Sequence, residues 1–299
     1  MYSCTKNRIS NITNSLQNTK LYGAQKTVIK EFEVLKDDSI DIVFINSPHK
    51  YHAQHALEAL QKNKAVFLDK PMATNIDQLE QLYQYSKQAS VPLFVDYNKS
   101  STSFARKIKT QISKRNSPLM LLYRMNAHFT PDELLQKKMG SGRVIGDACH
   151  VFDLFLYLMD CKPVSVSVES LHAKQDTIFP TENFSAQLSF EDGSVCTLFY
   201  TTLGNNQTTK ERMEIYFDNK TILMNDYIQL EGYGLPLAFN EHVRTPQQGQ
   251  KILLDAFFKS INQHPHHKET NLDRAYQATK ITLLVDNLAL KGGGEIELT

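Results

Sequence analysis

Three short apolar runs, separated by segments with helical spacing, constrain the fold of the first third of this chain most strongly. The runs are IVFIN, AVFLD and PLFVDY, at residues 42–46, 65–69 and 92–97. Apolar residues recur at helical spacing between them, at 51–62 and 76–89. Short strands that alternate with helices form parallel sheets with right-handed crossovers, and strands covered on both faces are continuously apolar. The pattern therefore predicts an α/β region built on a parallel sheet.

The second half of the chain has strand-like segments that follow one another without helices between them. These segments are residues 164–170, 184–190, 194–202, 213–217 and 221–230. Asp192-Gly193 and Asp218-Asn219 supply hairpin turns. The pattern predicts an α+β region with an open antiparallel sheet, flanked by helices that include residues 250–262 and 272–290. We therefore expect two domains, over residues 1–97 and 98–299.

Composition excludes several function classes. The net charge of +1 and the scattered basic residues do not favour a nucleic acid or an anionic membrane as partner. No apolar run is long enough to span a bilayer. The four widely spaced cysteines form neither a zinc pattern nor a small disulfide framework, which favours a reducing cytoplasm. His264, His266 and His267 have no acid or cysteine at matching spacing, so we expect a solvated loop there and no metal site.

Polar side chains follow each of the three predicted parallel strands, at the edge where open sheets of this kind bind ligands. The residues are Asn46, Ser47, Pro48, His49 and His52 after the first strand, Asp69, Lys70 and Pro71 after the second, and Tyr97, Asn98 and Lys99 after the third. For His49 and His52, position alone favours ordinary polar loop residues. For Lys70, two interpretations stay open: donation to a substrate oxygen, or a surface ion pair with Asp69.

The stretch GSGRVIGDACHVFD, at residues 140–153, has glycines one residue further apart than the dinucleotide fingerprint. It also follows a helical or loop segment rather than a strand, so we do not interpret it as a phosphate loop. It predicts a helix with Asp147 at the N-cap or in the first turn, and His150 three residues later on roughly the same face. A capped helix with a core-edge histidine and a neutral general base both remain open.

Four motifs in this order resemble the Gfo/Idh/MocA family of NAD(P)-dependent sugar and cyclitol oxidoreductases, from about residue 20 almost to the C-terminus. LDKPMA at 68–73 is similar to the family's E-K-P motif, and DIVFINSPHKYHAQHALEAL at 41–60 is similar to the preceding strand, turn and helix. DYNKSSTSF at 96–104 resembles the N-R-R-F segment that enters the second domain. GSGRVIGDACHVFDL at 140–154 resembles the glycine-rich stretch and the helix with the family histidine.

The resemblance implies a Rossmann-like domain with NAD or NADP, and hydride transfer between the nicotinamide and a secondary alcohol or ketone of a sugar, nucleotide sugar or cyclitol. Lys70 would bond to the reacting oxygen, His150 would be the general base, and Asp147 is a further catalytic candidate. The cofactor cleft would comprise Ser47, Pro48, His49, His52, Asp69, Lys70 and Asn98. The Lys70–Pro71 peptide would be cis. The resemblance also implies a homo-dimer or homo-tetramer formed through the outer face of the second sheet.

Two features depart from the family pattern. The acid usually found four residues before the histidine is replaced by Gly146, and Asp147 follows it. No G-x-G-x-x-G occurs among the 12 glycines. We therefore expect a truncated Rossmann-like domain without its first strand, phosphate loop and first helix, with Asn7–Leu21 as its second helix and Tyr22–Thr27 as the next strand. A dehydrogenase and a non-catalytic oligomerising remnant that has lost its cofactor both remain open.

Overall fold

The computed structural model describes residues 31–127, 142–172, 179–261 and 271–298, with side chains from residue 34 onward. The described parts of Met1–Asp96 and Leu254–Tyr276 form one compact unit, unit 1. Those of Tyr97–Leu253 and Gln277–Thr299 form unit 2. The helix predicted at Asn7–Leu21, the strand predicted at Tyr22–Thr27 and the clustered histidines His264, His266 and His267 lie outside the described residues.

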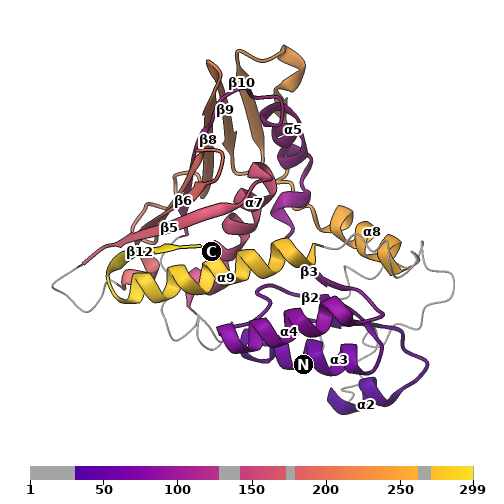
Figure 1. Cartoon of the computed structure of the whole chain (residues 1–299). Helices are drawn as coiled ribbons and strands as arrows, with labels where there is room; N and C mark the ends of the chain where they lie inside the picture. Colours follow the sequence, from indigo (N-terminus) through magenta and orange to yellow (C-terminus); the bar gives the residue numbers. More distant parts are fainter. Residues whose placement is uncertain (1–30, 128–141, 173–178, 262–270, 299) are drawn as a thin grey trace. The chain divides into compact units, whose positions relative to one another are not determined.

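Unit 1 contains a three-stranded parallel sheet in the order β1-β2-β3, as the apolar runs predicted. Its strands are β1 (Ile42–Ile45), β2 (Ala65–Leu68) and β3 (Leu93–Val95). Two crossover helices connect them, α3 (His52–Gln61) and α4 (Ile76–Gln88), and the short α2 (Glu31–Lys36) precedes β1 (Figure 1). The Rossmann-like parallel arrangement is therefore confirmed for the described strands.

Local sequence explains where these elements begin and what they bury. The Asn75 side chain accepts a hydrogen bond from the backbone N–H of Gln78 at 2.9 Å and so caps α4. Phe257, from helix α8 (Gln250–Ile261), is fully buried, with its ring centroid 5.4 Å from that of Phe67 and 5.5 Å from that of Phe94. A segment distant in sequence thus completes the core beside this sheet.

Unit 2 contains a nine-stranded sheet in the order β11-β10-β9-β8-β4-β7-β6-β5-β12. The strands are β4 (Met120–Asn126), β5 (Pro163–Ser170), β6 (Phe184–Phe190), β7 (Val195–Thr201), β8 (Glu211–Phe217), β9 (Lys220–Asn225), β10 (Gln229–Tyr233), β11 (Glu241–His242) and β12 (Gly293–Glu297). Every neighbouring pair is antiparallel except β4 and β7, which are parallel. The predicted antiparallel sheet is therefore mixed at one position.

One predicted strand was wrong in its extent. Residues 221–230 form two strands, β9 and β10, because the chain turns between them at Asp226 and Tyr227, whose φ angles are 48° and 56°. Asn and Asp favour turns because their side chains bond to nearby backbone and tolerate the left-handed region. Asp218 and Asn219, with φ angles of 45° and 55°, form the hairpin turn that the sequence predicted.

Helices cover one face of this sheet, and the other face carries exposed apolar side chains. Helices α5 (Ser103–Ile112) and α7 (Cys149–Met159) lie on the covered face, together with the unit 2 part of α9 (Leu272–Leu290) (Figure 1). Tyr123 on β4 points toward them, with its ring centroid 6.4 Å from that of Phe155. Because side chains alternate along a strand, Met120 on the same strand is 66% exposed on the opposite face.

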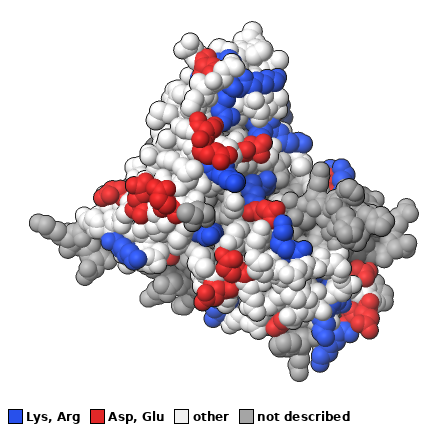
Figure 2. Space-filling view, in the orientation of Figure 1, with Lys and Arg blue, Asp and Glu red and all other residues white. Residues whose placement is uncertain are grey.

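Short turns and surface charge complete the fold. Single turns of 3-10 helix lie at η1 (His49–Tyr51), η2 (Lys99–Ser101), η4 (Pro180–Glu182) and η5 (Leu237–Phe239). Lys and Arg are interspersed with Asp and Glu on the face drawn in Figure 2. Among the described residues, no helix is both long and apolar enough to cross a membrane.

Candidate functional site

Three polar side chains that follow β1 in the sequence are buried, whereas loop residues are usually exposed. Ser47 and His49 are 6% and 7% exposed, and His52 is 0% exposed. Nδ1 of His52 lies 2.8 Å from the carbonyl oxygen of Pro71, and its Nε2 lies 2.7 Å from that of Ser47. The His52 ring therefore joins the turn after β1 to the turn after β2, which is more than a polar loop residue would do.

Burial sets the protonation of the two histidines. Burial, together with the charges of the neighbouring His52 and Lys70, lowers the pKa of His49 from 6.5 to about 3. Burial also lowers the pKa of His52, although the carbonyl groups of Pro71 and Ser47 act in the opposite direction. The two rings meet edge to face, with centroids 5.3 Å apart. The end of β1 thus presents buried imidazoles, and that of His49 is uncharged at neutral pH.

Lys70 follows β2 at a backbone that is held on both sides. The Asp69 carboxylate accepts the backbone N–H of Lys70 at 2.9 Å, and the next peptide, Lys70–Pro71, is cis, as the resemblance implied. The carbonyl of Pro71 is in turn bonded to His52. Asp69 and Lys70 are both half-buried. This arrangement fixes where the Lys70 side chain leaves the backbone.

The segment after β3 belongs to unit 2 and contacts the helix that contains His150. The ring of Tyr97 meets the His150 ring edge to face at 5.9 Å, and the Tyr97 hydroxyl bonds to that of Thr279 at 2.9 Å. Burial raises the pKa of Tyr97, so its hydroxyl stays protonated. One turn further on, Ser100 donates to the Asp153 carboxylate at 2.7 Å. Asn98, the predicted cofactor residue, is half-buried at the start of η2.

The helical segment that the sequence predicted here begins before Asp147, and Asp147 lies in its first turn, as predicted. Residues Val144–Ala148 form a π-helical turn, η3, and the α-helix α7 begins at Cys149. His150 is half-buried in the first turn of α7. The Asp147 carboxylate accepts the Tyr200 hydroxyl at 3.0 Å instead of capping α7. Because a π-helical turn is wider than an α-helical one, Asp147 and His150 contact different neighbours, Tyr200 and Tyr97.

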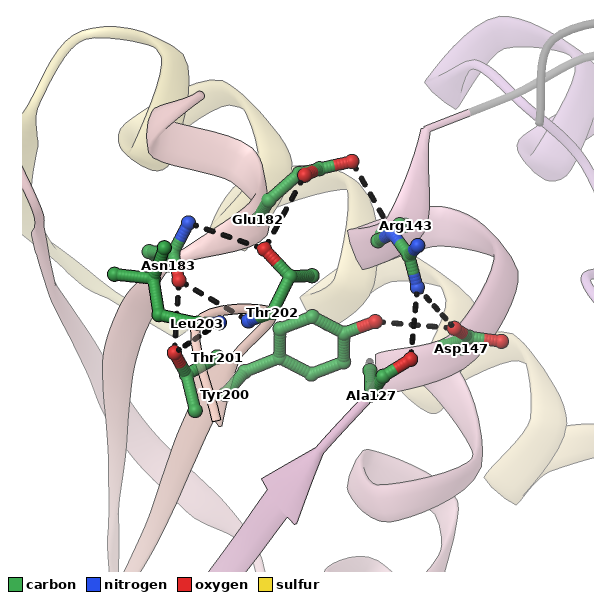
Figure 3. Close-up of polar contacts among 9 residues, drawn as sticks. All are labelled: Ala127, Arg143, Asp147, Glu182, Asn183, Tyr200, Thr201, Thr202 and Leu203. Atoms are coloured by element: carbon green, nitrogen blue, oxygen red, sulfur yellow. Dashed lines mark hydrogen bonds and ion pairs between the residues drawn. The ribbon is translucent and has the colours of Figure 1, made fainter. Parts of the chain in front are cut away.

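Arg143, Glu182 and Tyr200 surround the start of this helix, and sequence reasoning missed all three (Figure 3). Arg143 precedes Asp147 by four residues, the spacing of a helical ion pair, and this was the available signal. Glu182 and Tyr200 come from η4 and β7, so no local pattern connects them with the helix. Within the described ranges, no group of His, Cys, Asp and Glu side chains could hold a metal ion.

Two family models match this chain. Residues 6–97 match the oxidoreductase family model described as an NAD-binding Rossmann fold, and residues 119–223 match the GFO/IDH/MocA C-terminal domain. The chain belongs to the Gfo/Idh/MocA family of oxidoreductases. The two matched ranges agree with the resemblance that the four motifs indicated, and the first model is that of an NAD-binding domain.

Curated relatives match part of the chain. It is 28% identical over 172 residues to 1-carboxy-3-chloro-3,4-dihydroxycyclo hexa-1,5-diene dehydrogenase from Comamonas testosteroni, covering 55% of this chain and 43% of that protein. It is 26% identical over 166 residues to glucose-6-phosphate 3-dehydrogenase from Bacillus subtilis, covering 51% of this chain and 46% of that protein. The chain thus aligns with less than half the length of either relative.

Solved structures share the fold. An inositol dehydrogenase homolog from Azotobacter vinelandii, in complex with NAD+, superposes with a TM-score of 0.74 at 11% identity. The match covers 90% of this chain and 81% of that one. At this identity the likeness establishes the fold alone, and it agrees with the parallel sheet of unit 1 and the large mixed sheet of unit 2.

Proposed function

We propose that this member of the Gfo/Idh/MocA family is an NAD(P)-dependent oxidoreductase that interconverts a secondary alcohol and a ketone on a sugar, nucleotide sugar or cyclitol. The observation that carries the proposal is the lysine of the E-K-P-like motif. Lys70 is fixed at the end of β2 by the Asp69 carboxylate on one side and by the His52–Pro71 contact on the other. Relatives named glucose-6-phosphate 3-dehydrogenase and myo-inositol 2-dehydrogenase support a polyol substrate.

The residues behind the strands fit the nicotinamide end of the cofactor. Ser47, Pro48, His49, His52, Asp69 and Asn98 would hold it. The carboxamide group of the nicotinamide forms hydrogen bonds, and buried polar side chains such as the neutral His49 and the hydroxyl of Ser47 suit it. The G-x-G-x-x-G fingerprint that binds pyrophosphate in Rossmann domains has no match in the sequence. This is the observation that favours the second candidate, a non-catalytic remnant.

The proposed chemistry divides between two side chains. When bound, NAD(P)+ supplies the hydride acceptor. Lys70 donates a hydrogen bond to the substrate oxygen and stabilises the negative charge that develops on it. His150 accepts the hydroxyl proton, so that the O–H and C–H bonds break, a carbonyl forms, and the proton remains on the imidazole. Asp147, the further catalytic candidate, accepts a hydrogen bond from the Tyr200 hydroxyl, and we assign it a positioning role.

We also propose a homo-dimer or homo-tetramer formed through the outer face of the nine-stranded sheet. Met120, Phe199 and Tyr216 are 66%, 48% and 45% exposed there, and Met120 pairs directly with Tyr216 across β4 and β8. Apolar groups of this size are stabilised by a partner surface. Light scattering of the wild type and of Met120→Glu tests this. The added carboxylates would repel each other at the interface, so the molar mass in solution should fall toward that of the monomer. The proposed cytoplasmic location is supported by Cys149 and Cys196, two buried cysteines that form no disulfide.

The deciding experiment is a titration of the 299-residue chain with NADH and NADPH, followed by the fluorescence of the reduced nicotinamide. The chain has no Trp, so direct excitation of the nicotinamide is the suitable signal. Saturation at roughly micromolar cofactor, followed by turnover on a panel of sugars and cyclitols, supports the oxidoreductase. Absence of saturation up to millimolar cofactor overturns it for this polypeptide and supports the remnant. Parallel titrations with nicotinamide mononucleotide and AMP show which half of the dinucleotide is held.

A further inference from the structure

Arg143 is the most buried cation around the start of α7. Arg143 is 4% exposed and directly precedes the π-helical turn η3. Its Nε donates to Glu182 Oε1 at 3.1 Å, and its Nη1 donates to the carbonyl oxygen of Ala127 at 3.3 Å (Figure 3). The same Nη1 lies 3.8 Å from Asp147 Oδ2. One guanidinium therefore connects the end of β4, the η4 turn and η3.

Hydrogen bonds around this ion pair extend to the end of β7. Glu182 Oε2 accepts the Thr202 hydroxyl at 3.3 Å, and Asn183 Oδ1 accepts the Thr202 backbone N–H at 3.1 Å. The Tyr200 hydroxyl donates to Asp147 Oδ2 at 3.0 Å. Burial and the Asp147 carboxylate raise the pKa of Tyr200, so the hydroxyl keeps its proton and remains a donor. The start of the helix is thus attached to the sheet by a closed set of polar contacts.

Stability alone does not account for such a network. A buried ion pair gains little over well-packed apolar side chains of the same volume, because both charges lose their hydration. What it does provide is one defined geometry, since a fork of donors and two carboxylates pair well in few arrangements. This geometry is imposed on η3, and His150 follows η3 by two residues.

Charge acts on His150 as well as geometry. The titratable groups near His150 include Asp147 in η3 and Asp153 in α7, each three residues away in the sequence, and Tyr97 from the segment after β3. Asp153 is held by Ser100, and Tyr97 stays neutral. Arg143 faces Asp147 and offsets its charge. The field of Asp147 at the His150 ring therefore depends on whether the guanidinium is in place.

We infer that Arg143 is a positioning residue for His150: it holds η3 against the sheet and pairs with Asp147, so that the imidazole keeps its position against Tyr97. The inference rests on the proposed role of His150 as general base. It does not require Arg143 to touch substrate or cofactor.

The test is histidine NMR on the full chain, which needs no cofactor. The His150 ring resonance is identified by its loss in His150→Gln and is then titrated with pH in the wild type, Arg143→Met and Arg143→Lys. In Arg143→Met we expect the His150 pKa to rise by roughly half a unit to one unit, because Asp147 loses its cation. In Arg143→Lys most of that rise should be absent, since the variant keeps the positive charge beside Asp147. Arg115→Met is the matched control, because Arg115 pairs with Asp192 before β7, whereas Tyr200 lies near the end of that strand.

Kinetics provide a second measurement. Where the wild type turns over, Arg143→Met lowers kcat by about 100-fold, the cost of a misplaced catalytic group, and leaves the Kd for NADH within about 3-fold. An unchanged His150 resonance and pKa in Arg143→Met, together with a lower melting temperature, would show a merely structural residue and overturn the inference. If Arg143→Met does not fold, the same comparison is made with Tyr200→Phe and Arg143→Lys. Absence of NADH binding by the wild type overturns the proposed function but leaves the NMR result decisive.

Discussion

In unit 1 the histidine that joins the strand ends is held by backbone carbonyl groups, whereas in unit 2 the residues around the start of α7 are held by paired charges. His52 lies between the carbonyl oxygens of Ser47 and Pro71. Arg143 lies between the carboxylates of Glu182 and Asp147. Both arrangements are buried, and both fix a residue of the family motifs, Lys70 in unit 1 and His150 in unit 2.

The difference follows from what each region is proposed to do. A surface for the nicotinamide carboxamide has to offer hydrogen bonds in a buried position, and the neutral imidazole of His49 suits this. A proton acceptor has to stay in one position while its own charge changes, and a fixed ion pair beside it provides a field that is already oriented. The two regions should therefore respond differently to substitution and to pH.

The largest expected effect is on catalysis in unit 1. Lys70→Met should lower kcat about 1,000-fold, worth ~4 kcal/mol of transition-state stabilisation, because the reacting oxygen loses its charged donor. The free energy of unfolding should change little, since Lys70 is half-buried. Lys64→Met is the matched control: Lys64 Nζ donates to the carbonyl groups of Asp37 and Ile40, so its loss affects stability and not turnover. Unchanged kcat in Lys70→Met would contradict the mechanism.

Breaking the charge network of unit 2 comes next. Glu182→Ala should lower the free energy of unfolding by about 3 kcal/mol, because the buried Arg143 guanidinium loses its nearer carboxylate and keeps only that of Asp147, at 3.8 Å. The side chains of Arg143 and Glu182 are 3% and 7% exposed. Asp192→Ala removes the partner of Arg115 from a pair that is 13% and 28% exposed, and water can hydrate what remains, so about 1 kcal/mol or less is expected. Urea unfolding measures both, and equal losses would show that burial of the pair is unimportant.

A pH-dependent loss of stability should distinguish unit 1. His49 has a pKa of about 3 in the folded chain and 6.5 as its ordinary value, so the unfolded chain binds more protons between these limits. The contribution of His49 to the free energy of unfolding is therefore complete above pH 6.5, and it decreases as the pH falls toward 3. At pH 5 the loss is about 2 kcal/mol. Urea unfolding at pH 7.5 and pH 5 should show a smaller difference in His49→Gln than in the wild type, while the exposed His242→Gln behaves as wild type.

Periodicity predicted unit 1 well because its elements are determined locally. Apolar runs gave β1, β2 and β3, and the family motif gave the position of Lys70 and its cis peptide. The strand-end rule also brought His49 and His52 to the sheet edge. The sequence could not reveal that His52 joins two turns, because Ser47 and Pro71 contribute backbone atoms there, and any residue type would supply the same carbonyl group.

Unit 2 was less predictable because its key contacts connect distant segments. Arg143 meets Glu182 across 39 positions, and Tyr200 meets Asp147 across 53. Nothing in the helical pattern of residues 140–153 distinguishes a π-helical turn from an α-helical one, since both bury the same apolar side chains. The strand break at Asp226 was available from composition, because polar turn residues interrupt an apolar run there.

The smallest effect is expected for the loss of one hydrogen bond of the unit 2 network, that between Tyr200 and Asp147. Tyr200→Phe keeps the ring, which stacks on Phe184 at 5.3 Å, and removes only the hydroxyl that donates to Asp147. We expect a loss of about 1 kcal/mol in the free energy of unfolding, because the partly exposed carboxylate regains water. Tyr216→Phe, whose exposed hydroxyl donates to Glu214, should lose less. In a double-mutant cycle, the losses from Tyr200→Phe and Asp147→Ala should not add, since each substitution removes one partner of the same hydrogen bond. Additive losses would mean that the Tyr200–Asp147 hydrogen bond does not help to hold the start of the helix. The attachment to the end of β7 would then depend on the hydrogen bond between Glu182 and Thr202.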